Sequence, residues 1–213
     1  MFSCQHIGDN PCESDYADIE ARSIPVPIDT SQVPQDKLTD ARFLSLHAEI
    51  QGALNHLGYV NAFCIHEAGH MIYFSKAGFA EFDFHGPRIV YDSERDDFDG
   101  YPAAIQPKPY NIDFSNMDIQ KWLSTVAQAH AAGGVFARKL ANARDGGDEE
   151  DRQHFDNMCG VVQRQIPNIE IDREASWRGA QDAVLKDLRS PAFRTEAWNK
   201  ARKIKERLFG VLI

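Results

Sequence analysis

The sequence has few cysteines and no long apolar segment. Its four cysteines, at positions 4, 12, 64 and 159, are too few and too scattered for a disulfide framework. This usage fits a reducing, cytoplasmic compartment. The N-terminal residues contain neither the basic nor the apolar stretch of a signal peptide. No apolar run approaches the roughly 18 residues of a membrane-spanning helix, so we expect a soluble protein.

Positive charge and nucleotide-binding motifs are also scarce. Lysine and arginine number 23 against 32 aspartates and glutamates, which gives a net charge of -9. Nucleic acids and anionic membranes require a basic surface, so neither is an expected partner. The chain has no G-x-x-x-x-G-K-S/T motif, and any activity is therefore expected to be independent of ATP.

The remaining composition is that of a globular protein with an N-terminal extension. Hydrophobic residues make up 43% of the chain, which is enough for a sizeable core. Residues 1–36 are predicted to form an irregular N-terminal arm, because the three prolines of SIPVPIDTSQVP lack the amide donor that a helix needs. Residues 37–213 are then expected to form one domain.

Two helices are predicted directly after the arm. Apolar residues recur at spacings of three and four from Phe43 to Leu57, which is typical of a helix with one buried face. A second helix is predicted from about Tyr59 to Ala77, and Gly78 is a suitable residue to end it.

Residues 79–110 change to a strand-like pattern. FAEFDF alternates apolar and polar residues, HGP is typical of a turn, and RIVY is predicted as a second strand. SERDDFDG is predicted as a polar loop, and YPAAIQP as a short third strand that its prolines confine to an edge. The strand at 79–84 is either an exposed edge that accepts a peptide by main-chain pairing or part of an ordinary hairpin.

The C-terminal half is predicted to be helical. Ser115 and Asp118 form a capping-box pattern before a long helix, and a further helix is expected to end at Pro167. Two more helices are predicted near 172–188 and 191–209, the second with a proline at its first position. The predicted fold class is therefore α+β and mainly helical, with a small β-hairpin or sheet inserted after the second helix.

The motif H-E-x-x-H, at His66, Glu67 and His70, is the strongest indication of chemistry. Residues four apart lie on one face of a helix, so two imidazoles can reach one metal at about 2.0–2.1 Å. Glu67 lies about 100° further around the helix, where it can take a proton from the attacking water and later deliver it to a leaving amine. The alternative is a chance match on an amphipathic helix, although unsatisfied His and Glu side chains are costly to bury there.

A zinc hydrolase needs a third protein ligand and an open fourth position. Asp148 and Asp151 share one face of the predicted helix and compete for this role, whereas Glu150 points elsewhere. Asp148, at the helix boundary, is expected to cap exposed amides instead. A solvated acidic helix start, favoured by the helix dipole, is the alternative for the whole cluster. The candidates in GGDEEDRQHFDN are Asp148, Glu149, Glu150, Asp151, His154 and Asp156.

These motifs resemble the peptidase domain of the FtsH family of AAA+ zinc proteases. HEAGH matches the family's zinc-binding sequence at every position, and residues 147–151 have the form of its second signature, a glycine, three residues and the zinc-binding aspartate. AHAAGGVFARKL is similar to the family's glycine-rich helix between the two motifs. The resemblance covers roughly residues 59–78 and 125–160. It implies a stand-alone, zincin-like helical peptidase domain in which His66, His70 and Asp151 bind zinc and Glu67 is the base.

Other histidines and cysteines are weaker candidates for ligands. Cys4, His6 and Cys12 could form part of a second metal site, but a complete set needs a fourth ligand, and an unstructured tail is the simpler interpretation. His130 is predicted to be a packed or exposed helix residue. His154, one turn beyond Asp151, is either a partner that orients a ligand or an exposed helix residue.

The sequence therefore predicts a zinc-dependent, ATP-independent endopeptidase that hydrolyses unfolded or flexible polypeptides, with Zn2+ as its cofactor. Two alternatives stay open: a regulatory H-E-x-x-H protease specific for one partner protein, and a non-catalytic, metal-stabilised interaction module. Glu67 argues against the second, because a purely structural site has no use for a base. A polypeptide substrate is the expected partner, and the formation of a homo-oligomer is left open.

Overall fold

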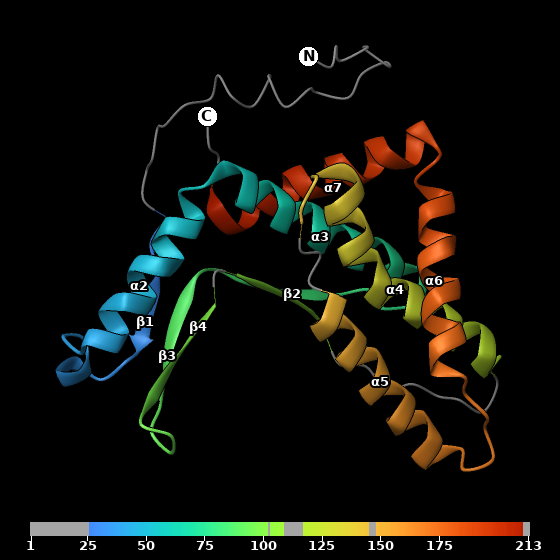
Figure 1. The fold of residues 1–213 in the computed structure, drawn as a ribbon, viewed down its shortest axis with the longest axis horizontal. Helices are drawn as coiled ribbons and strands as arrows, with labels where there is room; N and C mark the ends of the chain where they lie inside the picture. Colours follow the sequence, from blue (N-terminus) through green and yellow to red (C-terminus); the bar gives the residue numbers. More distant parts are fainter. Residues whose placement is uncertain (1–25, 102, 109–116, 145–147, 211–213) are drawn as a thin grey trace.

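A computed structural model of the chain describes residues 26–101, 103–108, 117–144 and 148–210. Within them the fold is α+β and mainly helical, as predicted, with small sheets beside a group of helices (Figure 1). The strands are β1 (Asp29–Gln32), β2 (Phe82–His85), β3 (Arg88–Asp92), β4 (Asp97–Tyr101) and β5 (Ala104–Pro107). The helices are the short 3-10 helix η1 (Gln35–Lys37), α2 (Ala41–Leu54), α3 (Leu57–Lys76), α4 (Ile119–Leu140), α5 (Asp148–Gln165), α6 (Arg173–Asp187) and α7 (Pro191–Phe209).

Helix α3 lies at the centre of the helical part. It packs against α4 and α7, and α4 in turn packs against α5 and α6 (Figure 1). Much of the core lies between α3 and α4, where Ile65 and Tyr73 of α3 and Val126 and Phe136 of α4 are fully buried. Because both helices are packed on several sides, they form a firm support for side chains that α3 presents.

The ends of α3 have identifiable causes. At its N-terminal end the His56 side chain accepts a hydrogen bond from the amide of Tyr59 (3.2 Å). After its C-terminal end Gly78 has φ 98°, a left-handed conformation that glycine adopts without a steric penalty. The helix predicted at about 59–77 is confirmed to within two residues. The preceding helix is confirmed as well, with Phe43 and Ile50 on its buried face, but it ends at Leu54, and Leu57 is the first residue of α3.

The strand pairing differs from the prediction. β2 pairs with β5, with Phe84 opposite Ile105, instead of forming a hairpin with β3 across the HGP turn. β3 pairs with β4, with Val90 opposite Asp99, and β4 lies mostly in the segment predicted as a polar loop. The loop prediction was wrong because Phe98 is the single buried residue of β4, and its acidic neighbours mask the alternation that identifies a strand.

Part of the predicted N-terminal arm is also a strand. β1 pairs in parallel with β3, with Gln32 opposite Val90, and the adjacent Val33 is buried. The four polar residues of β1 carry no strand signal of their own, so the available partner strand decides their conformation. Residues 1–25 of the arm, with Cys4, His6 and Cys12, lie outside the described residues.

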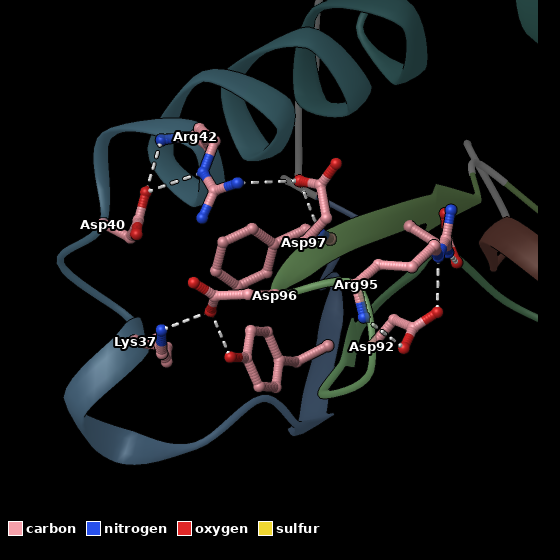
Figure 2. A network of polar contacts seen from close by, with 10 residues as sticks. Lys37, Asp40, Arg42, Asp92, Arg95, Asp96 and Asp97 are labelled. Carbon is pink, nitrogen blue, oxygen red and sulfur yellow. Dashed lines mark hydrogen bonds and ion pairs between the residues drawn. The ribbon is translucent and has the colours of Figure 1, made fainter.

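Charged side chains connect the β3–β4 turn to the segment just before and within α2 (Figure 2). Lys37 Nζ donates to Asp96 Oδ1 at 2.7 Å, and Arg42 Nη1 donates to Asp97 Oδ1 at 3.5 Å. Asp96, whose φ of 48° forms the tight turn, also accepts a hydrogen bond from the Tyr91 hydroxyl. These acidic side chains are therefore neutralised by cations of the same chain, and the network orients the β3–β4 turn relative to α2.

The helices predicted in the C-terminal half are confirmed. The side chain of Asp118 accepts a hydrogen bond from the amide of Lys121 (3.0 Å), so Asp118 itself caps α4. The predicted cap, Ser115, lies outside the described residues. Ser190 caps α7 and Pro191 is its first residue, as predicted. None of the described helices combines the length and the apolar character needed to cross a membrane.

Candidate metal centre

Helix α3 brings the two motif histidines together. The Nε2 atoms of His66 and His70 are 2.8 Å apart, and their rings meet edge to face with centroids 4.5 Å apart. Both side chains are partly buried on the same side of the helix, as the spacing of four residues predicts. Two nitrogen donors therefore point at one position.

Asp151, in the first turn of α5, completes the cluster. Its Oδ1 lies 3.1 Å from His70 Nε2 and its Oδ2 lies 3.6 Å from His66 Nε2. Ligands held tetrahedrally at about 2.0–2.2 Å from zinc lie about 3.3–3.5 Å from one another, so only small adjustments admit an ion. Within the described part of the chain, His66, His70 and Asp151 form the one group of three such side chains with this proximity.

The Asp151 carboxylate has the environment of a ligand. The residue is 7% exposed, and its Oδ2 atom is buried with no hydrogen-bond partner among the described residues. A buried carboxylate oxygen without a partner is destabilising, and native structures rarely leave one unsatisfied. A cation between this oxygen and the two imidazoles satisfies it, so the donor set fits a divalent metal.

A hydrogen bond to helix α4 fixes the orientation of the His70 ring. Its Nδ1 lies 2.7 Å from the carbonyl oxygen of Ala129 in α4. A carbonyl oxygen can only accept, so Nδ1 must donate the proton, and neutral His70 therefore has a free lone pair on Nε2. Hydrogen bonds of this kind orient metal-binding histidines and increase their basicity.

Two glycines allow α4 to approach the motif. A Cβ atom on Gly133 of α4 would overlap His70 Nε2 and would lie 2.7 Å from His66 Cε1. A Cβ atom on Gly69 of α3 would lie 2.7 Å from the carbonyl oxygen of Ala132. The glycine within HEAGH and Gly133 of α4 are thus explained by close helix packing beside the histidine cluster.

The charges of the metal-free cluster are strongly coupled. Burial disfavours the charged form of His70, but the charge of Asp151 and the hydrogen bond to it outweigh burial and raise the pKa of His70 to about 9. Burial also opposes ionisation of Asp151, and the charges of His70 and His66 nevertheless lower its pKa. Without a metal, the cluster therefore favours the protonated form of His70, and a cation bound there would compete with that proton.

Glu67 lies beside the cluster and is 9% exposed. Burial raises the pKa of Glu67 to about 7, with the charge of His70 acting in the opposite direction and those of Asp151 and Glu150 adding to the rise. A carboxylate with a pKa near neutrality can both accept and return a proton at physiological pH. This is the property that the sequence motif requires of a general base.

The competing acidic residues have other partners or are exposed. Asp148 forms an ion pair with Arg138 of α4, and Asp156 pairs with Arg152. Glu149, Glu150 and His154 are exposed. In the structure Asp148 lies outside the cluster of His66, His70 and Asp151 and forms an ion pair with Arg138 instead. Gly147, the first residue of the second signature, lies outside the described residues.

His130 is a packed core residue, as one of the two predicted alternatives had it. It is 9% exposed, and its ring meets that of Phe74 edge to face with centroids 5.0 Å apart. Burial and the charge of His70 lower the pKa of His130 to about 3, so the residue is neutral. Sequence reasoning did not identify Ala129, Arg138 or the role of Gly133, because each acts through contacts between helices that are distant in sequence.

Comparisons of this chain with protein-family models, with curated proteins and with solved structures find no match. The chemistry is therefore argued from the geometry of the cluster. The resemblance of HEAGH and the acidic helix start to the FtsH family stays an expectation.

Proposed function

We propose that this chain is a zinc-dependent, ATP-independent endopeptidase that acts on unfolded or flexible polypeptides. The observation that carries the proposal is the convergence of His66 and His70 from α3 with Asp151 from α5, next to the buried carboxyl of Glu67. A purely structural metal site needs four ligands and no further acidic group. Glu67 is a further acidic group beside the ligands, and its raised pKa suits it to proton transfer.

The donor set favours zinc. Two imidazole nitrogens and one carboxylate oxygen, with a fourth position left open, form a frequent ligand set of catalytic zinc. The same three donor types also bind Fe(II) in oxygenases. The neighbouring base favours hydrolysis, because water activation requires a proton acceptor beside the metal.

The protein side chains divide the work of peptide hydrolysis. The metal, when bound, supplies Lewis acidity that polarises the scissile carbonyl and makes a water acidic enough to react. Glu67 accepts a proton from the attacking water and returns it to the departing amine. His70 is held in place by its hydrogen bond to the Ala129 carbonyl oxygen. Burial raises the pKa of the Glu67 carboxyl, which makes the carboxylate a stronger base for the attacking water.

The resemblance to the FtsH peptidase domain supports the same proposal. HEAGH and the aspartate four residues after Gly147 supply the three residues that the structure brings together. By this resemblance the chain is a zincin-like peptidase domain that works without an attached ATPase. A regulatory protease specific for one partner protein shares this site and differs in substrate range. The remaining alternative is a non-catalytic metal-stabilised module.

Metal analysis combined with a cleavage assay tests the proposal. The purified protein should bind about one zinc per chain and should cleave casein until a chelator removes the metal. Glu67→Gln should retain the zinc and lose nearly all cleavage, because an amide cannot accept the proton. His66→Ala and His70→Ala should lose the zinc itself.

A matched control separates the loss of the catalytic base from the loss of one negative charge on the protein. Glu49→Gln alters an exposed glutamate of α2 and should leave cleavage unchanged. Wild-type cleavage by Glu67→Gln would refute the assigned base. A zinc-loaded protein that cleaves no polypeptide would favour the non-catalytic module, and iron in place of zinc would refute the hydrolase assignment.

A further inference from the structure

The metal ligands come from two helices that need separate alignment. His66 and His70 are fixed within α3 by its packing against α4. Asp151 belongs to α5, which follows α4 after residues 141–147. Because the cluster requires Asp151 Oδ1 to lie 3.1 Å from His70 Nε2, the first turn of α5 must be held at a defined place beside α4.

One ion pair lies at that place. Arg138, in the last turns of α4, donates through Nη1 to Asp148 Oδ2 at the start of α5. Among the described residues it is the ion pair that links these two helices. Its side chains are 33% and 35% exposed, and the second oxygen of Asp148 is fully buried. The pair is therefore partly enclosed between the helices, where its charges are screened less than at an open surface.

Asp148 and Asp151 are mechanically connected. They lie three residues apart in α5, on the same side of the helix. A constraint on the side chain of Asp148 therefore limits both the rotation of α5 about its axis and the distance of its first turn from α4. The same contact keeps the Asp148 carboxylate on a cation of the protein and away from the metal position.

We propose that Arg138 is a positioning residue of the metal centre, which holds the first turn of α5 through Asp148 so that Asp151 reaches the metal. This inference rests on the metal site of the proposed function. It does not depend on catalysis, because its consequence is the affinity and geometry of metal binding.

The test compares metal binding by Arg138→Gln with that of the wild type. Partners that orient metal ligands typically contribute about 10–100-fold in affinity, and the zinc dissociation constant of Arg138→Gln should rise by about that factor. The absorption spectrum of the cobalt-substituted variant should also change, since it reports the coordination geometry. Arg138→Lys keeps the charge and should recover part of the affinity.

Arg173→Gln is the matched control. Arg173 of α6 donates to Gln163 Oε1 (2.8 Å) and thus ties the opposite end of α5 to the fold. Its removal should affect the unfolding of the metal-free protein about as much as Arg138→Gln does, while the zinc affinity and the cobalt spectrum stay those of the wild type. Asp148→Asn combined with Arg138→Gln should weaken zinc binding no more than either single substitution, because both remove the same contact.

The outcomes separate this inference from the proposed function. Wild-type zinc affinity and an unchanged cobalt spectrum in Arg138→Gln would overturn the positioning role and leave the metal site intact. Equal losses of affinity in Arg138→Gln and Arg173→Gln would also overturn it, since general loosening of α5 would then be the cause. A wild-type protein that takes up no zinc or cobalt would refute both the metal site and the role of Arg138.

Discussion

Asp148 and Asp151 lie three residues apart in the first turn of α5, and they have different partners. Asp148 is bound to Arg138, whereas Asp151 faces His66 and His70, and its Oδ2 atom accepts no hydrogen bond from the described residues. Asp151→Ala should therefore weaken zinc binding by orders of magnitude, because a ligand is lost. Asp148→Ala should cost the smaller factor of about 10–100 that is typical of residues behind the ligands.

Zinc competition titrations of the two variants check this ranking. Asp156→Ala is the control, since Asp156 pairs with Arg152 in the same helix and lies outside the metal cluster. An Asp151→Ala variant with wild-type affinity, or a larger loss in Asp148→Ala than in Asp151→Ala, would show that the third ligand has been assigned to the wrong residue.

Neutral His130 should make the protein sensitive to acid. Burial first, and then the charges of His70 and His154, lower its pKa to about 3, while Asp151 acts in the opposite direction. An unfolded chain has a histidine pKa of about 6.5. Between these values the unfolded state binds a proton that the folded state excludes. The contribution of His130 to stability is therefore present above the unfolded pKa and lost as the pH falls below it.

Denaturant unfolding of the wild type and of His130→Gln at a series of pH values measures this effect. In the acidic range the wild type should lose up to about 1.4 kcal/mol per pH unit more than the variant, the slope expected for one proton. His47→Gln, in α2, is the control histidine and should follow the wild type. Equal slopes for the wild type and His130→Gln would contradict a buried, neutral His130.

At the scale of the helices, the approach of α4 to α3 depends on two glycines with different neighbours. A methyl group on Gly133 would meet the rings of His66 and His70, which can rotate away. A methyl group on Gly69 would meet the backbone of Ala132, which cannot. We expect Gly133→Ala to abolish zinc binding with little loss of fold. Gly69→Ala should instead lower the free energy of unfolding by about 1–3 kcal/mol through overpacking.

Zinc affinity and denaturant unfolding, measured on both variants after chelation, separate these effects. Gly179→Ala in α6 is the matched control, because no atom lies within 4 Å of the added methyl group. That variant should keep its zinc and gain about 0.5–1 kcal/mol of stability from the better helix propensity of alanine. Tight zinc binding by Gly133→Ala would mean that the two helices are further apart than the structure has them.

The elements that the sequence predicted are those with a strong local pattern. The stripe from Phe43, the motif helix and the capped start of α7 at Ser190 each contain their own signal, and each helix forms where it is predicted. β1 and β4 were missed, because polar residues dominate both and a partner strand provides their structure. Strand pairing is a long-range choice that no local turn motif decides.

The candidate site shows the same division between local and distant information. His66, Glu67 and His70 are set by one helical period and could be placed from the sequence. Asp151 needed the resemblance in addition, because spacing alone left Asp148 as a competitor. The support from Ala129 and Arg138 depends on how α4 packs against α3 and α5, and no motif in the sequence encodes that packing.

For the whole molecule, the metal would join parts of the fold that otherwise meet along limited surfaces. His66 and His70 belong to the central helix α3, and Asp151 lies in the first turn of α5, which leads on to α6. A ligand that binds the folded state alone stabilises it by about 4 kcal/mol when its concentration is a thousand times its dissociation constant. Domains of about 150–250 residues gain roughly 2–4 °C in melting temperature per kcal/mol.

Removal of zinc should therefore lower the melting temperature of the wild type by about 8–16 °C under such saturating conditions. Thermal unfolding followed by circular dichroism, with zinc in excess and then with a chelator, measures the difference. Glu67→Gln should show the same drop in melting temperature, because the base is not a ligand, whereas His66→Ala should melt at one temperature in both conditions.

In hydrogen exchange, the first turn of α5 should lose protection on chelation before the core between α3 and α4 does, since Asp151 is the ligand outside that core. The outcome that would contradict this is an unchanged melting temperature after chelation of a wild-type protein that contained zinc beforehand. The metal would then bind somewhere other than the junction of α3 and α5.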